Sequence, residues 1–165
     1  MAPPGWTEPL TISDVAHAWI FPNAAVLYTE SLLEVPRLDH VKSLFDFFTW
    51  VNEHVPIDEP ATLVHDWRSF RSVPLEVRRA FAAQRHAMKA ANQSPGVRRV
   101  VVATSASPVV RLGIQAVSLA AQMIGVGVPV ELVSEPEKPL LERVRTPPDP
   151  GLHARLRLAW RHAEG

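Results

Sequence analysis

The sequence predicts an α/β fold: a single domain with a mixed, mostly parallel sheet, an N-terminal antiparallel hairpin and flanking helices. Short runs of β-branched and other apolar residues alternate along the 165 residues with longer segments in which apolar residues recur every three or four positions. Polar residues and prolines separate these segments, as they do at the boundaries of strands and helices. Strands and helices that alternate in this way form mainly parallel sheets through right-handed crossovers.

Composition excludes several classes of protein. The chain is 47% hydrophobic and 21% charged with a formal net charge of zero, so it lacks the excess positive charge of a protein built to hold nucleic acid. It contains no cysteine, which excludes disulfides, thiolate metal sites and a cysteine nucleophile. Neither a secretory signal nor an apolar stretch long enough to span a bilayer is evident, and we expect a cytoplasmic protein.

The first part of the chain is predicted to form a leader, a hairpin and a helix. Residues 1–16 begin with several prolines and a glycine and are expected to be a flexible leader. Runs rich in aromatic and branched residues at His17–Phe21 and Ala24–Thr29 flank the turn-prone pair Pro22-Asn23, which indicates an antiparallel hairpin. Apolar residues at helical spacing then predict a helix from about Arg37 to His54.

The next unit joins a buried strand to a helix through a polar turn. The apolar run Thr62–Val64 stops at His65 and Asp66, and a segment with helical periodicity starts at Pro74. Pro74 suits the first turn of a helix, where Ser72 is well placed as a cap. The polar residues of this turn are Asp66, Arg68, Ser69, Arg71 and Ser72.

A second strand and helix follow in the same manner. Val100–Ala103 is an apolar run typical of a strand covered on both faces, and Ser107 with Pro108 indicates the start of a helix that ends near Ile124. The predicted buried stripe of this helix is Leu112, Gln115, Ala116, Leu119, Ala120 and Met123. Apolar residues also occupy its other faces, so the helix is expected to be deeply buried or to face a partner.

The end of the chain is predicted to hold a strand at Val128–Val133 and a short helix at Glu135–Val144. Residues 145–151 form a Pro-rich linker, and residues 152–165 form a short basic C-terminal helix. The folded domain is therefore expected to span residues 17–144.

The order of elements and three local sequences resemble the STAS superfamily. These sequences are the strand end Val-His-Asp-Trp-Arg-Ser-Phe at residues 64–70, the strand Arg99–Ala103 and the closing pattern at residues 128–140. The superfamily includes bacterial anti-sigma-factor antagonists and SpoIIAA-like domains, and the likeness covers about His17–Val144. It implies a regulatory or scaffold domain that acts through protein–protein interaction.

The resemblance also implies a phosphosite. Antagonist-type members are phosphorylated on a serine at the start of the helix that follows this strand, and Ser72 is the residue in that place, with Ser69 second. The Asp-Ser-Ser-Gly sequence of those members is replaced here by Arg71-Ser72-Val73-Pro74.

The polar strand ends predict an anion or ligand site. Ligands of open parallel sheets gather at the carboxyl ends of strands, beside helix N-termini. If the two strands are neighbours, arginines and hydroxyls converge there in a way that suits a phosphate or a carboxylate. The alternative is that the serines are helix caps and the arginines are solvated. The candidate residues are Asp66, Arg68, Arg71, Ser105 and Ser107.

The sequence offers little support for catalysis or for metal binding. His65 and Asp66 invite an acid–base interpretation, but alternation along a strand sends their side chains to opposite faces. No pair of histidines has the spacing of metal ligands on one helix. We therefore expect no catalytic residue, no metal and no cofactor.

A partner surface is predicted on the two helices before and after the central strand. One face of the first helix cannot bury all its aromatic residues, which leaves Phe47 and Trp50 for edge packing, a partner protein, a second copy of the chain or an acyl ligand. Arg78, Arg79 and Arg85 are expected on the outer face of the next helix, either solvated or facing an acidic protein or anionic lipid.

The sequence as a whole predicts a non-enzymatic regulatory or scaffold domain that acts through protein–protein interaction and self-associates through an apolar helix. The first alternative is a binding module for a lipid or another apolar small ligand, suggested by the surplus of helical aromatic residues. The second is an enzyme that uses the polar groups at the carboxyl ends of the strands. Partners are expected to be protein, a second copy or lipid, and not nucleic acid.

Overall fold

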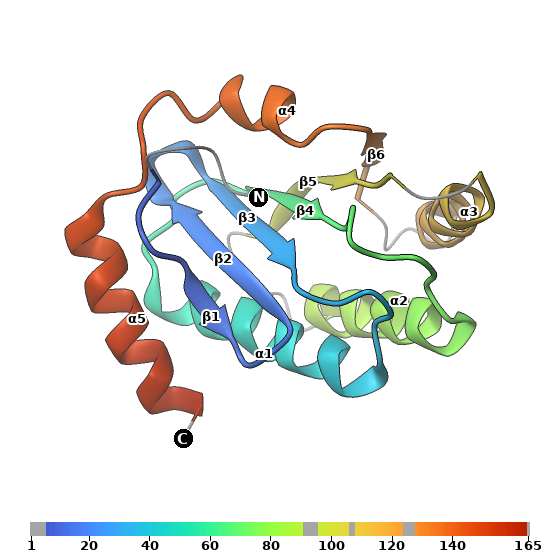
Figure 1. Ribbon diagram of the computed structural model, residues 1–165, viewed down its shortest axis with the longest axis horizontal. Coiled ribbons are helices and arrows are strands. Elements are labelled where there is room, and N and C mark those ends of the chain that lie inside the picture. Colours follow the sequence, from blue (N-terminus) through green and yellow to red (C-terminus); the bar gives the residue numbers. More distant parts are fainter. Residues whose placement is uncertain (1–5, 91–95, 106–107, 124–127, 165) are drawn as a thin grey trace.

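The computed structural model describes residues 6–90, 96–105, 108–123 and 128–164 (Figure 1). The described residues form an α/β fold with a six-stranded mixed sheet, as the sequence predicts. The strands are β1 (Leu10–Ile12), β2 (Ala16–Phe21), β3 (Val26–Ser31), β4 (Ala61–Asp66), β5 (Val97–Ala103) and β6 (Val130–Val133). The α-helices are α1 (Leu38–His54), α2 (Leu75–Ala90), α3 (Pro108–Met123), α4 (Glu137–Leu141) and α5 (Pro150–Glu164).

The strands lie in the sheet in the same order as in the sequence. β1, β2 and β3 pair antiparallel, and β3 to β6 pair parallel. The hairpin is confirmed, and a single 3-10 turn at Pro22–Ala24 closes it. Each parallel strand is joined to the next by one right-handed crossover. The helices of these crossovers, α1, α2 and α3, therefore lie on the same side of the sheet.

Two apolar cores lie on opposite faces of the sheet. The larger core joins α1 and α2 to side chains such as Leu63, Val100 and Val102. The smaller one packs the short helix α4, through Leu140, against the alternate residues Val64 and Val101. Figure 1 shows α1 and α2 beneath the sheet and α4 above it. Strands β4 and β5 are thus covered on both faces, which explains their continuous apolar sequences.

The N-terminal part of the sheet extends beyond the expected domain. We predict a flexible leader up to residue 16, but Leu10 and Ile12 of β1 are fully buried in the larger core. Their spacing of two residues is the alternation of a half-covered strand, with the exposed Thr11 between them. Trp6 also packs against the rings of Trp19, Phe21 and Tyr28 on the other face.

The C-terminal helix α5 covers the β1 side of the domain. His153 and Trp160 of this helix are buried, and Trp160 donates a hydrogen bond from its indole nitrogen to the Thr11 carbonyl at 3.0 Å. The His153 Nε2 lies 3.1 Å from the Ile20 amide nitrogen. The basic helix that the sequence predicts here is therefore an integral layer of the fold.

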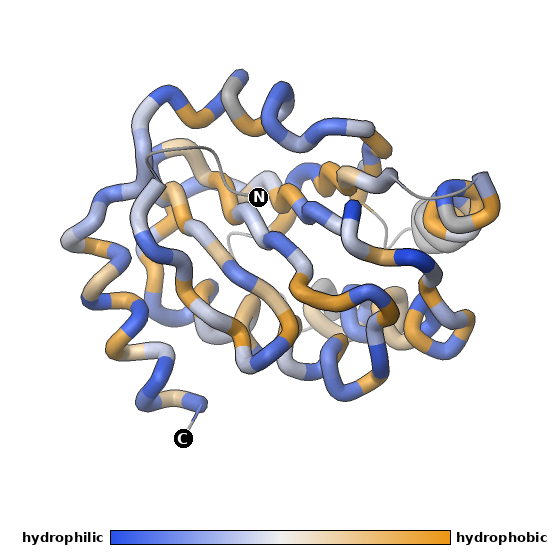
Figure 2. The backbone as a smooth tube through the Cα atoms, viewed as in Figure 1, coloured by the Kyte–Doolittle hydropathy of each residue, from blue (hydrophilic) through white to orange (hydrophobic). Residues whose placement is uncertain are grey.

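Helix α3 differs from the prediction for its buried side. The expected stripe includes Leu112 and Leu119, but both are exposed, whereas Ile114 is buried. Figure 1 places α3 at the periphery of the molecule, and Figure 2 shows hydrophobic residues on it. Because this helix is apolar around most of its circumference, its periodicity could not identify the side that faces the sheet.

Candidate functional site

The polar site predicted at the carboxyl end of β4 is a closed network of charges. Asp66 accepts hydrogen bonds from Arg68 Nε at 2.9 Å and Arg68 Nη2 at 2.6 Å. The Tyr28 hydroxyl donates to the same carboxylate at 3.1 Å, and Glu137 of α4 lies 3.3 Å from Arg68 Nη2. Tyr28 is paired with Val64 in the sheet, so the register places its ring on the face occupied by Asp66.

The ionisation of this network matches its geometry. Burial raises the pKa of Asp66, but hydrogen bonds from the side chain and the backbone of Arg68 outweigh burial and hold that pKa below its usual value. Burial and the neighbouring Asp66 charge raise the pKa of Tyr28 well above that of a free tyrosine. The carboxylate therefore stays charged, the phenol stays neutral, and the guanidinium of Arg68 is compensated by two acids.

The other predicted anion ligands also have partners or lie apart. Ser105 donates a hydrogen bond to the Arg68 carbonyl at 2.8 Å, which joins the ends of β4 and β5. Arg71 forms an exposed ion pair with Glu34 at 2.8 Å. Ser107 lies outside the described residues. The structure thus gathers Asp66, Arg68 and Ser105, and it pairs both arginines of the proposed site with carboxylates of the chain.

The two candidate phosphosites lie in the loop between β4 and α2. Ser69 is exposed and donates a hydrogen bond to the Ser31 carbonyl at 3.1 Å. Ser72 is also exposed. The first hydrogen bond of α2 runs from the Arg78 amide to the Pro74 carbonyl, which makes Pro74 the capping residue. Ser72 therefore lies two residues before the capping position. Phosphorylation of either serine stays a prediction.

His65 lies on the face opposite to Asp66, as strand alternation predicts. Its Nδ1 is 2.7 Å from the hydroxyl of Thr29, which is its register partner on β3. Its ring stacks on Trp67, and its Nε2 is buried without a hydrogen-bond partner among the described residues. Burial, with a smaller contribution from the charge of Arg85, lowers the pKa of His65 to about 3. His65 is therefore a neutral core residue and shares no proton with Asp66.

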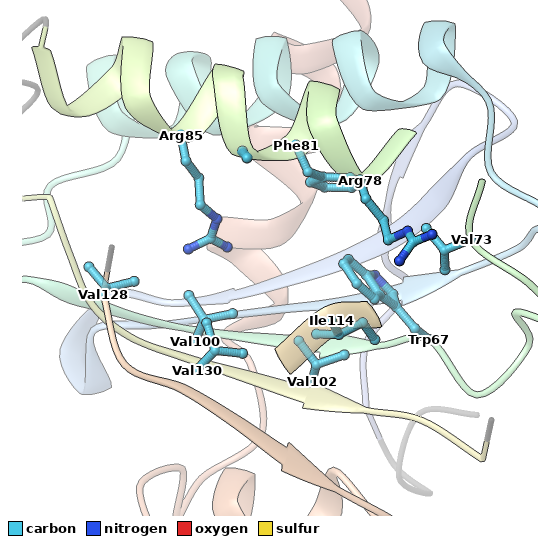
Figure 3. Close-up of a pocket in the computed structure, with 11 residues that line it drawn as sticks. Trp67, Val73, Arg78, Phe81, Arg85, Val100, Val102, Ile114, Val128 and Val130 are labelled. Atoms are coloured by element: carbon cyan, nitrogen blue, oxygen red, sulfur yellow. The ribbon is translucent and has the colours of Figure 1, made fainter. Parts of the chain in front are cut away.

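On this helix-covered face, the structure contains an apolar cavity that the sequence did not reveal. The cavity measures about 80 Å³ and lies between α2, α3 and the end of the sheet formed by β5 and β6. Figure 3 shows Val100, Val102, Val128 and Val130 on the sheet side of the cavity and α2 above them. The lining residues are Trp67, Val73, Arg78, Phe81, Ala82, Arg85, Val100, Val102, Ile114, Val128 and Val130.

Two arginines of α2 extend into this cavity. Arg78 and Arg85 are two helical turns apart, on the same side of α2 as Phe81, and both side chains point toward the sheet in Figure 3. The Nε of Arg78 is buried without a hydrogen-bond partner among the described residues. Burial lowers the pKa of Arg85 to about 10, which reflects the cost of holding a charge in apolar surroundings.

Gly113 of α3 makes room for one of these side chains. A Cβ at this position would collide with Arg78 Nη1 and lie 3.3 Å from Arg78 Cζ. Glycine inside a helix is less favourable than alanine by about 1 kcal/mol. The glycine therefore permits the close approach of the Arg78 guanidinium to the backbone of α3.

The residues of the predicted partner surface lie in three different environments in the structure. Phe47 and Trp50 are buried under α5, where their rings lie 5.0 Å and 5.3 Å from that of Trp160. Arg79 is exposed, as expected. Arg78 and Arg85, which we expected on the outer face of α2, line the cavity because the side that they share with Phe81 faces the sheet. The spacing of Arg78 and Arg85 indicates that they share one side of α2. It could not show that this side lines a cavity, because the opposite wall comes from strands and a helix that are distant in sequence.

Among the described residues, no three histidine, aspartate or glutamate side chains lie close enough to hold a metal ion. None of the described helices has both the length and the apolar sequence needed to cross a membrane. In comparisons with known proteins, no family model, no curated protein and no solved structure matches the chain.

Proposed function

We propose that this protein is a non-enzymatic regulatory or scaffold domain of the STAS type that self-associates through α3. The observation that carries the proposal is an exposed apolar stripe on this helix. Val109 is 76% exposed, Leu112 64% and Leu119 59%, and Ala116 between them is exposed as well. Their spacing of three, four and three residues places all four side chains on one side of the helix.

Such a stripe favours a protein partner. Large apolar side chains that form a contiguous exposed surface are typical of interaction sites, whereas scattered ones are common on any protein. Helix α3 has 16 residues and is therefore about 24 Å long, enough for several turns of helix–helix contact.

The partner that fits this stripe best is a second copy of the chain. Arg111 is the one charged residue in the sequence of α3, so an antiparallel pair of these helices would bring few like charges together. The formal net charge of the whole chain is zero, which removes long-range repulsion between copies. A two-fold axis would place the same stripe on both sides of the contact.

Element order supports the STAS-type assignment. A hairpin is followed by strands and helices in strict alternation, and the parallel strands lie side by side in chain order. The stretch at residues 64–70, on which the sequence resemblance rests, forms the end of β4 and the loop before α2. The regulatory role follows from this resemblance and the self-association from the stripe.

Analytical ultracentrifugation tests the self-association. We expect a concentration-dependent dimer for the wild-type protein and a monomer for Leu112→Glu, because a carboxylate at the centre of the stripe would be buried without a partner. Leu158→Glu is the matched control: Leu158 is equally exposed but lies on α5, and this variant should remain dimeric. A wild-type protein that stays monomeric at every concentration would overturn the proposal.

A second candidate function is a binding module for an apolar small ligand. The specific observation in its favour is the cavity beneath α2, most of whose lining residues are apolar. Thermal unfolding with and without octanol tests this function, because a ligand that binds only the folded state raises Tm. We expect a higher Tm with octanol, and an unchanged Tm would count against a cavity that accepts apolar ligands.

A further inference from the structure

The cavity beneath α2 contains positive charge without any compensating negative charge. Its lining consists of nine uncharged residues together with Arg78 and Arg85, and no aspartate or glutamate is among them. Among the described residues no carboxylate pairs with Arg85, and the parts of the chain that the structure does not describe contain no aspartate or glutamate. Helix α3, which forms one wall, has no acidic residue either.

An arginine in such surroundings is costly for the free protein. A charge that leaves water is tolerated in a protein interior when an opposite charge or several hydrogen bonds compensate it. Arg68, on the other side of the sheet, meets this condition through Asp66 and Glu137. Arg85 does not, and the lowered pKa of its guanidinium is the consequence. The missing partner of Arg85 is therefore expected to come from outside the chain.

The chemistry of the cavity selects one class of anion. A guanidinium matches the two oxygens of a carboxylate in a planar, bidentate pair. Apart from Arg78 and the indole N–H of Trp67, the remaining lining is made of valines, Ile114, Phe81 and Ala82, which offer contacts to an apolar body and no hydrogen-bond donors for a strongly hydrated phosphate. A cavity of about 150 Å³ can hold benzene, so about 80 Å³ suits a short or narrow apolar group.

We propose that this cavity binds a small monocarboxylate with an apolar body, of the kind of a short- or medium-chain fatty acid, with its carboxylate on Arg85. The apolar body then lies against Val100 and Val130 and extends toward Ile114. Arg85 remains partly exposed, so the ligand can enter beside it. This inference rests on the second candidate function, the binding of apolar small ligands, and adds the recognition of a carboxylate.

Isothermal titration calorimetry with a matched series of small molecules tests the ligand class. We expect octanoate to bind to the wild-type protein more tightly than octanol, and octylamine to bind most weakly, because the series keeps the chain and changes only the head group. Butanoate should bind no more weakly than octanoate, because a cavity of about 80 Å³ can enclose the shorter chain and leaves part of the longer chain outside. Fluorescence adds a local readout: Trp67 is the cavity tryptophan, and the change that octanoate causes should be absent from Trp67→Phe.

The variant Arg85→Met tests the residue. Methionine keeps the length and apolar character of the side chain and removes its charge, so octanoate affinity should fall by about tenfold or more while octanol affinity is retained. Arg79→Met is the matched control, because Arg79 lies on the same helix but is exposed. Circular dichroism of both variants establishes that they fold. Equal octanoate affinity in Arg85→Met and the wild type would overturn the role of Arg85.

The outcomes separate this inference from the function on which it rests. If octanol and octanoate bind equally well, the cavity accepts apolar ligands but the recognition of a carboxylate is refuted. If neither binds, both the inference and the second candidate function are refuted. If inorganic phosphate binds as tightly as octanoate, the apolar body contributes nothing and the proposed ligand class is wrong.

Discussion

The two faces of the sheet differ in whether buried charges have partners of opposite charge. Two adjacent residues of β4 illustrate the difference. Asp66 points to the α4 face, where Arg68, Tyr28 and Glu137 complete a network in which each charge has a partner. His65 points to the face covered by α1 and α2, where burial keeps it neutral. The same face holds Arg85, whose charge has no acidic partner among the described residues.

This difference separates a structural charge cluster from a candidate binding site. Several polar residues occur at the carboxyl end of β4 in the sequence, but in the structure Arg68 and Arg71 are both paired with carboxylates of the chain. The cavity cannot be recognised in the sequence, because nine of its lining residues are uncharged and come from segments distant from one another. A charge that the fold leaves uncompensated is the more informative sign of a missing ligand.

The largest effect is expected for Asp66→Ala. This substitution leaves Arg68 and the Tyr28 hydroxyl without their main partner in a partly buried place, so the free energy of unfolding should fall by about 3 kcal/mol. Urea denaturation measures the loss. A loss below about 1 kcal/mol would show that solvent compensates Arg68 and that the two faces are less different than the structure indicates.

The second effect is a pH dependence that originates from His65. Its pKa is about 3 in the folded protein and about 6.5 in an unfolded chain, so the unfolded state binds more protons between these values. Stability should therefore fall as the pH is lowered from about 6.5, by up to about 1.4 kcal/mol per pH unit.

His65→Gln identifies the source of this slope. Glutamine can still hydrogen-bond the Thr29 hydroxyl but does not titrate, so the slope between about pH 6 and about pH 4.5, above the range of most carboxyl groups, should become shallower. Urea denaturation at several pH values measures it. A slope that His65→Gln leaves unchanged would assign the pH dependence to other groups.

A smaller effect, of opposite sign, is expected for Arg85→Met in the absence of ligand. Removal of an uncompensated charge from apolar surroundings should raise the free energy of unfolding by about 1 kcal/mol. The exposed Arg79→Met should change it little. A marked loss of stability in Arg85→Met alone would mean that the arginine is a structural residue, and it would remove the contrast between Arg85 and Arg68.

The smallest effect is expected for Arg71→Ala. Its ion pair with Glu34 is exposed on both sides, and such pairs contribute from nothing to about 0.5 kcal/mol. Thermal unfolding should therefore give nearly the wild-type Tm. A large decrease would show that the loop before α2 depends on this pair, and the carboxyl end of β4 would then be a wider structural network than its contacts indicate.

The sequence by itself determined the identity and order of the elements. The run of branched and aromatic residues at Ala24–Thr29, the continuous apolar run Val100–Ala103 and the three- and four-residue spacing in Arg37–His54 are local patterns, and each predicted its element within a few residues. It also determined that His65 and Asp66 lie on opposite faces, because alternation in a strand depends on the backbone alone.

Only the tertiary structure decided what covers each face. Periodicity shows that Phe47 and Trp50 lie beside the inward stripe of α1, but their cover is α5, more than a hundred residues away in sequence. Helix α3 is apolar nearly all round, so its inward side is set by the sheet, and Leu112 was assigned to the wrong side. The environment of Arg85 depends on β5, β6 and α3 together. Whether a side chain is buried, and whether a charge has a partner, depends on elements that are distant in sequence. A local sequence pattern therefore cannot specify either.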